Sequence, residues 1–156
     1  NFKMINDTRG HLEGDRFLAQ TAQTFSQCVR AVDIVCRYGG DEFVAILPST
    51  RQFVAIRIAN RFKNAVREIP GATGYNVSAS IGIAEFTVSS PWDENKFIQS
   101  ADFAMYEAKS KGGNQVCTTG YHRKIDGGLE PVSIQEKDAI SSIRDSEQGQ
   151  GERDGA

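Results

Sequence analysis

The chain has 156 residues, of which 39% are hydrophobic and 24% are charged. This composition fits one compact domain with a hydrophobic core, and two domains would be too small to be stable. The 18 Lys and Arg residues nearly balance the 20 Asp and Glu residues, which excludes a broad basic surface that binds nucleic acid. No apolar run reaches the about 20 residues of a membrane-spanning helix, so we expect no membrane contact from this segment.

Hydrophobic periodicity predicts an α+β fold. Apolar residues recur at helical spacing in three segments, whereas Val77, Ala79, Ile81 and Ile83 alternate with small or polar residues, as in a strand with one buried face. In chain order, the predicted elements are a helix over 12–29, strands over 34–38 and 43–47, a helix over 52–68, a strand over 77–83, a helix over 94–111 and an edge strand over 115–118. Helices interleaved with hairpins favour a sandwich in which helices cover a mainly antiparallel sheet.

The composition changes near the C-terminus. Residues beyond Gly120 are rich in Gly, Ser and charged side chains and show no sustained hydrophobic period. Such a segment buries too little apolar surface to offset its ordering entropy. We therefore predict a domain over residues 1–118 and a polar, disordered tail or linker over 119–156. Three scattered cysteines form no CxxC pair, which favours a reducing cytoplasm.

The sequence Gly39-Gly40-Asp41-Glu42-Phe43 lies at the tip of the predicted hairpin. Two residues without Cβ allow a ligand to approach the backbone closely. The adjacent carboxylates of Asp41 and Glu42 repel each other unless a divalent cation such as Mg²⁺ neutralises them, and such sites commonly share the metal with substrate phosphates. Taken alone, the motif is more typical of an acidic, solvated turn, because Gly and Asp are ordinary residues at hairpin tips.

Four blocks of the sequence together resemble the GGDEF family of diguanylate cyclases, over about residues 1–118. The blocks are Phe2-Lys3-x-Ile5-Asn6-Asp7-x-x-Gly10-His11-x-x-Gly14-Asp15, Arg37 to Phe43, Ser80 to Ala84, and Ala101-Asp102-x-Ala104-Met105-Tyr106-x-Ala108-Lys109. The resemblance implies a nucleotidyl-cyclase fold of the ferredoxin-like palm type. It also implies a homodimer that condenses two GTP into cyclic di-GMP with Mg²⁺ or Mn²⁺.

The resemblance assigns roles to individual residues. It implies that Asp41 and Glu42 bind metal, and that Glu42 is also the catalytic residue. Gly39 and Gly40 leave room for the phosphates, Asn6 and Asp15 recognise guanine, and Lys109 contacts the triphosphate. From the residue types alone, Asn6 and Asp15 are more typical of helix caps and turns, and Lys109 is typical of a solvated lysine near a helix end.

Two departures from the family pattern stand out. A second triphosphate-binding Arg of many members is replaced by Gly113. The family's first strand, which carries a metal-binding Asp just upstream of Phe2-Lys3, is absent from this sequence. We therefore expect an N-terminally truncated domain with an incomplete metal site and exposed core surface, derived from a parent protein that could be membrane-anchored.

Arg30-Ala31-Val32-Asp33 resembles the family's RxxD inhibitory motif, at which cyclic di-GMP binds as a product inhibitor. Arg61 matches an arginine that completes this site, although it also belongs to a basic, solvated helix face. The guanidinium group suits phosphate and guanine recognition. The main alternative to a cyclase is a non-catalytic module that senses GTP or cyclic di-GMP and regulates an attached domain, and a further one is an inactive structural fragment.

Overall fold

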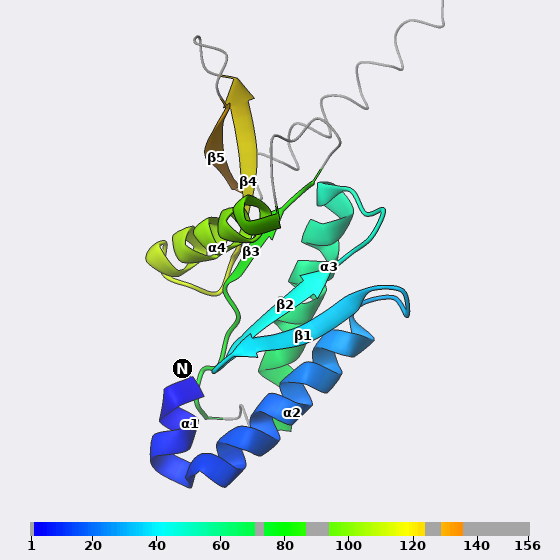
Figure 1. Ribbon diagram of the computed structural model, residues 1–156. Helices are drawn as coiled ribbons and strands as arrows, with labels where there is room; N and C mark the ends of the chain where they lie inside the picture. The colour runs from blue at the N-terminus through cyan, green and yellow to red at the C-terminus, as the bar shows by residue number, and fades with distance from the viewer. Residues whose placement is uncertain (1, 71–73, 87–93, 124–128, 136–156) are drawn as a thin grey trace, which may run out of the picture.

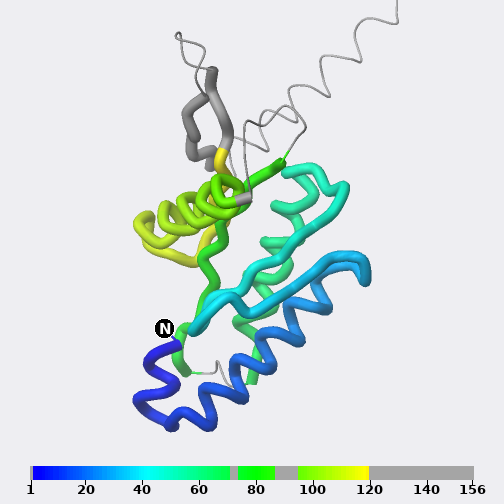
Figure 2. Tube along the Cα trace, in the orientation of Figure 1, coloured from blue at the N-terminus to red at the C-terminus, as the bar shows by residue number. Residues whose placement is uncertain are grey.

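The computed structural model describes the backbone of residues 2–70, 74–86, 94–123 and 129–135 (Figures 1 and 2). Side chains are described for 2–70, 74–86 and 95–119. It is an α+β fold, as predicted. No helix among these residues is long and apolar enough to cross a bilayer.

The N-terminal part is a helical corner. Helix α1 spans Phe2–Arg9 and helix α2 spans His11–Gln27, separated by Gly10 at a φ of 83°. Only glycine adopts this φ without strain, so Gly10 fixes the direction in which α2 leaves α1. The sequence predicted α2 but not α1, because Asn6, Asp7 and Thr8 are poor helix formers that are typical of turns.

The predicted hairpin is present. Strand β1 (Ile34–Gly39) pairs antiparallel with β2 (Glu42–Ile46). Ile34 and Ile46 lie opposite each other and are 55% and 50% exposed. This end of the hairpin therefore carries two half-exposed isoleucines among the described residues, and the truncation expected from the sequence stays a prediction.

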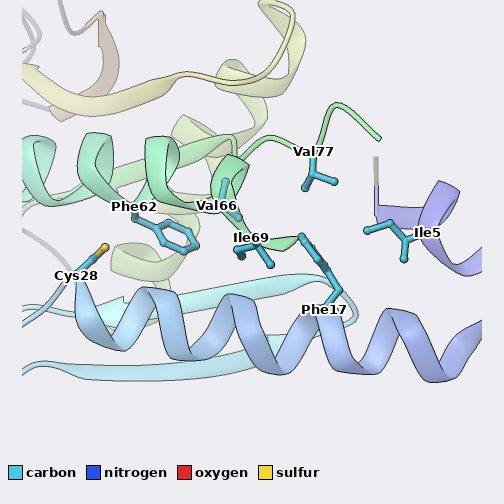
Figure 3. Packing of buried hydrophobic residues seen from close by; sticks show 7 residues of the cluster. All are labelled: Ile5, Phe17, Cys28, Phe62, Val66, Ile69 and Val77. Carbon is cyan, nitrogen blue, oxygen red and sulfur yellow. The ribbon is translucent and has the colours of Figure 1, made fainter. Parts of the chain in front are cut away.

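Helix α3 (Gln52–Ala65) continues as the 3-10 helix η1 (Val66–Glu68), so the predicted helix ends in a tighter turn. The main core lies between α2 and α3 (Figure 3). Phe62, Val66 and Ile69 project there toward Phe17 and Cys28, and Phe25 stacks on Phe62 with ring centroids 4.2 Å apart. Burial of these rings and aliphatic groups fixes the two helices against each other.

The C-terminal part is a second sheet. Strand β3 (Ile81–Ala84) pairs in parallel with β4 (Val116–Arg123), and β4 pairs antiparallel with β5 (Leu129–Gln135). Helix α4 (Glu94–Ser110) packs on β3 and β4. The contact with β3 is so close that a Cβ on Gly82 would lie 2.0 Å from the backbone oxygen of Ala101.

Three details of the predicted strands are corrected. The strand predicted over 77–83 begins only at Ile81, because among the described residues no strand pairs with 77–80, although Val77 and Ala79 still pack on the core. The edge strand predicted over 115–118 is the central strand β4. Its extension and β5 lie in the segment predicted to be a disordered tail, so that prediction is wrong for these two strands. Residues 124–128 and 136–156 lie outside the described residues, and a domain boundary at 118 stays a prediction.

The described strands form two sheets, β1–β2 and β3–β4–β5, rather than one. Within these sheets, β2 is paired only with β1, and β3 only with β4. Strands β2 and β3 therefore each have one edge without a strand partner in the described part of the chain. Helix α2 contacts β1 and α3, and α3 contacts β3 and β4, so the two packed helices connect the sheets.

Candidate functional site

The turn between β1 and β2 carries the signature residues. The ladder is irregular between Arg37 and Gly39, and Gly40 has a φ of 48°. Arg37 closes the turn, because its Nε donates a hydrogen bond to the carbonyl oxygen of Gly40 at 2.9 Å. A Cβ on Gly39 or Gly40 would meet no atom within 4 Å, so the space over the two glycines is open.

Glu42, the first residue of β2, lies next to the last turn of α4. Its Oε1 is 3.6 Å from the Nζ of Lys109, and both side chains are about half exposed. The structure thus brings together the predicted catalytic carboxylate on strand β2 and the predicted triphosphate-binding lysine on helix α4, which are far apart in the sequence. An exposed pair of this kind adds little stability, so both groups remain available to a ligand.

The two predicted guanine-binding residues lie at the α1–α2 corner. The side chain of Asn6 covers Gly14, since a Cβ there would lie 1.8 Å from Asn6 Oδ1. Asp15 is the next residue of α2 and is exposed. The glycine lets the amide of Asn6 approach α2 at the position before Asp15, so both residues belong to this corner.

The signature turn carries two adjacent carboxylates. Asp41 and Glu42 are exposed and offer the oxygen ligands that Mg²⁺ and Mn²⁺ prefer. The Lys109 ammonium already lies beside Glu42, which shows that a cation can approach this carboxylate. No group of three or more His, Cys, Asp or Glu side chains in the described ranges is placed to hold a metal ion.

The second predicted site is a cluster at the C-terminal end of α2. Nε and Nη2 of Arg30 donate to the two carboxylate oxygens of Asp33 at 3.2 and 2.7 Å. These bonds hold the pKa of the Asp33 carboxyl below its usual range and raise the pKa of Arg30. Arg61 on α3 donates to the carbonyl oxygen of Cys28, the C-cap of α2. All three predicted residues therefore lie around one helix end.

Sequence reasoning missed the contacts that orient these side chains. It gave Arg37 no individual role, and it did not connect Arg30 with the loop after β2, where Pro48 and Thr50 accept hydrogen bonds from Arg30. The Arg37 bond spans three residues and is a common way to close a turn, so a local signal existed. The contacts of Arg30 with Pro48 and Thr50 depend on tertiary structure, and no local pattern indicates them.

For the diguanylate cyclase activity that the family resemblance implies, we expect Arg37→Ala to lower turnover by roughly 10- to 100-fold, because small displacements of reacting groups have effects of this size. Without the bond to the Gly40 carbonyl, the turn would no longer hold Asp41 and Glu42 in one position. Steady-state kinetics and circular dichroism would measure the effect and check the fold. Arg67→Ala, at an exposed arginine of η1, is the control, and equal turnover in the two variants would contradict the prediction.

Comparisons with known proteins agree with this geometry. Residues 1–115 match the family described as diguanylate cyclase, GGDEF domain. The chain is 38% identical over 117 residues to the diguanylate cyclase DosC of Escherichia coli K12, covering 74% of this chain and 25% of DosC. It is 41% identical over 120 residues to the response regulator PleD of Caulobacter vibrioides, covering 74% of this chain and 26% of PleD. The chain thus spans about a quarter of the length of these relatives.

Solved structures show the same likeness. Diguanylate cyclase SiaD of Pseudomonas aeruginosa, solved with its activator SiaC, matches with a TM-score of 0.68 at 32% identity over 75% of this chain and 45% of that one. The GGDEF domain of DgcB from Caulobacter crescentus, solved with c-di-GMP, matches with a TM-score of 0.64 at 28% identity. The match covers 75% of this chain and 71% of the DgcB chain. Together these findings show that the chain belongs to the GGDEF family of diguanylate cyclase domains.

Proposed function

We propose that the protein containing this domain is a diguanylate cyclase that condenses two GTP into cyclic di-GMP and releases pyrophosphate. The observation that carries the proposal is the contact between Glu42 of an intact signature turn and Lys109 of α4. It places a carboxylate and an ammonium group 3.6 Å apart at an exposed position next to the turn that contains Gly39 and Gly40. Membership of the GGDEF family supports the same activity.

The reaction requires a sugar hydroxyl to attack an α-phosphate. A bond forms between the 3′ oxygen and phosphorus, the bond to pyrophosphate breaks, and the hydroxyl proton is transferred to a base. We assign the proton acceptor to Glu42, which is exposed and at the edge of the open turn. Lys109 would leave Glu42 for the triphosphate and balance the negative charge that collects on the departing oxygens.

Mg²⁺ or Mn²⁺, when bound, would neutralise the phosphate oxygens, and Asp41 and Glu42 are the residues of this chain that would hold it. Asn6 and Asp15 would recognise guanine, since a carboxylate accepts hydrogen bonds from the N1–H and the N2 amino group. Adenine lacks this pair of donors. Because each subunit would bind one GTP, the two nucleotides meet only in a homodimer. We place this reaction in the cytoplasm, where GTP is available.

The test is direct synthesis. The purified protein, and a version with any residues that precede Asn1 in the encoded polypeptide, would be incubated with GTP and Mg²⁺ and assayed by mass spectrometry. Cyclic di-GMP from either version supports the proposal. A folded dimer that forms no product but binds GTP or cyclic di-GMP would contradict it and identify a sensing module.

We also propose that cyclic di-GMP inhibits the enzyme at Arg30, Asp33 and Arg61. The support is the position of all three residues around one end of α2. Arg30→Ala is expected to relieve inhibition by added cyclic di-GMP, because it removes the guanidinium group that would bind phosphate. Turnover measured against product concentration would show this, with Arg67→Ala as the control. Inhibition that persists unchanged in Arg30→Ala would show that the site is misassigned.

A further inference from the structure

Arg30 is held far more firmly than an exposed arginine of a solvated turn. Besides its two bonds to Asp33, its Nη2 donates to the carbonyl oxygen of Pro48 at 3.0 Å and to Oγ1 of Thr50 at 2.6 Å. The backbone N–H of Arg30 also donates to Asp33 Oδ2 at 2.7 Å. The guanidinium therefore joins the loop after α2 to the loop between β2 and α3.

The loop after β2 has an unusual conformation that creates these contacts. Ser49 has a φ of 52°, which non-glycine residues rarely adopt. The residues on its two sides, Pro48 and Thr50, both present an oxygen to the same nitrogen of Arg30. The hydroxyl of Thr50 also donates to the Pro48 carbonyl at 3.1 Å, so the hydroxyl has both a donor and an acceptor role.

The arrangement leaves one end of the guanidinium free. All the side-chain bonds of Arg30 use Nε or Nη2, and Nη1 makes none within the described residues. The Arg30 side chain remains 52% exposed, whereas that of Asp33 is covered. In this conformation both carboxylate oxygens of Asp33 accept hydrogen bonds from Arg30.

We propose that Thr50 is a positioning residue of the cyclic di-GMP inhibitory site, acting together with the Pro48 carbonyl and Asp33 to fix Arg30 with Nη1 directed outward. An arginine fixed in this way loses less conformational entropy when it binds phosphate, so the fixed orientation raises affinity. This inference rests on the proposed inhibitory function. It adds a residue from the loop before α3 that the family resemblance did not indicate.

Thr50→Val tests the role of the hydroxyl at nearly constant shape. The hydroxyl makes no cap bond to α3, whose N-cap residue is Arg51, so the substitution should not disturb the helix. Isothermal titration calorimetry with cyclic di-GMP, on protein freed of bound product, is expected to show about five- to tenfold weaker binding, the effect of losing one ordinary hydrogen bond. Thr50→Ser keeps the hydroxyl and should restore affinity to within about twofold of wild type.

Two further measurements separate the possible failures. Thermal unfolding of all variants would show whether Thr50→Val acts by destabilising the fold. Serine restores the hydroxyl but is smaller than threonine, so recovery of affinity in Thr50→Ser would show that the hydroxyl, and not the side-chain volume, is required. If Arg30→Ala abolishes binding while Thr50→Val binds as wild type, the positioning role is refuted and the inhibitory site stands. If Arg30→Ala binds normally, the inhibitory site itself is wrong.

Discussion

Replacing Glu42 with Gln is expected to lower the rate of cyclic di-GMP synthesis by at least about 100-fold, the lower limit for loss of a general base. The amide keeps the size of the side chain but cannot accept the proton of the 3′ hydroxyl and binds a divalent cation poorly. The fold should be unaffected, because the Glu42 side chain is half exposed and its contact with Lys109 is a surface ion pair. Single-turnover assays with GTP, together with circular dichroism, would measure both properties.

Glu107→Gln is the matched control for this variant. Glu107 also belongs to an ion pair on α4, with its Oε2 at 3.1 Å from Nζ of Lys111, but it is not one of the residues assigned to the site. Its substitution should change turnover little. If Glu42→Gln retained wild-type turnover, Glu42 would be neither base nor metal ligand. Loss of activity in both variants would indicate a general effect of removing a negative charge instead.

Gly82→Ala is expected to destabilise the domain by about 3 kcal/mol or more, at the upper end of the range for overpacking. The added Cβ would lie 2.0 Å from the oxygen of Ala101 and 2.3 Å from the nitrogen of Met105. Both are backbone atoms of α4, so no side chain can rotate away, and the helix must move off β3. Urea unfolding followed by circular dichroism would give the difference in free energy.

Gly39→Ala provides the comparison. A methyl group on Gly39 would meet nothing within 4 Å, and its φ is not positive. This variant should unfold within about 1 kcal/mol of wild type. Equal stability of Gly82→Ala and Gly39→Ala would show that α4 does not approach β3 as closely as described.

The elements that could be predicted from the sequence are those with a strong local signal. The hairpin strands fall within one residue of their predicted bounds, because β-prone runs flank two consecutive glycines. Helix α4 was likewise predicted within one residue of its end. Helix α1 was missed because its short, polar sequence has no hydrophobic period of its own and is stabilised by contacts such as that of Phe2 with Phe17.

The site was predictable only in part, because some of its contacts join residues that are far apart in the sequence and leave no local signal. The acidic turn follows from Gly39 to Glu42, but the proximity of Glu42 and Lys109 followed from the family resemblance and not from any pattern in the residues. The central position of β4 was not predictable, since its partner β5 lies in a segment whose composition indicates a tail. Contacts of Arg30 with Pro48 and Thr50 require a backbone conformation at Ser49 that no sequence rule assigns to serine.

The contact between Glu42 and Lys109 also bears on the order in which the molecule folds. The β1–β2 turn is local and can form within about 1–10 μs, as isolated hairpins do. Lys109 reaches this turn only after α3, β3 and α4 have packed, because the chain between the two residues contains all three elements. Long-range contacts of this kind form late. We therefore expect nascent chains to carry an acidic turn without its neutralising lysine until the C-terminal half of the domain has folded.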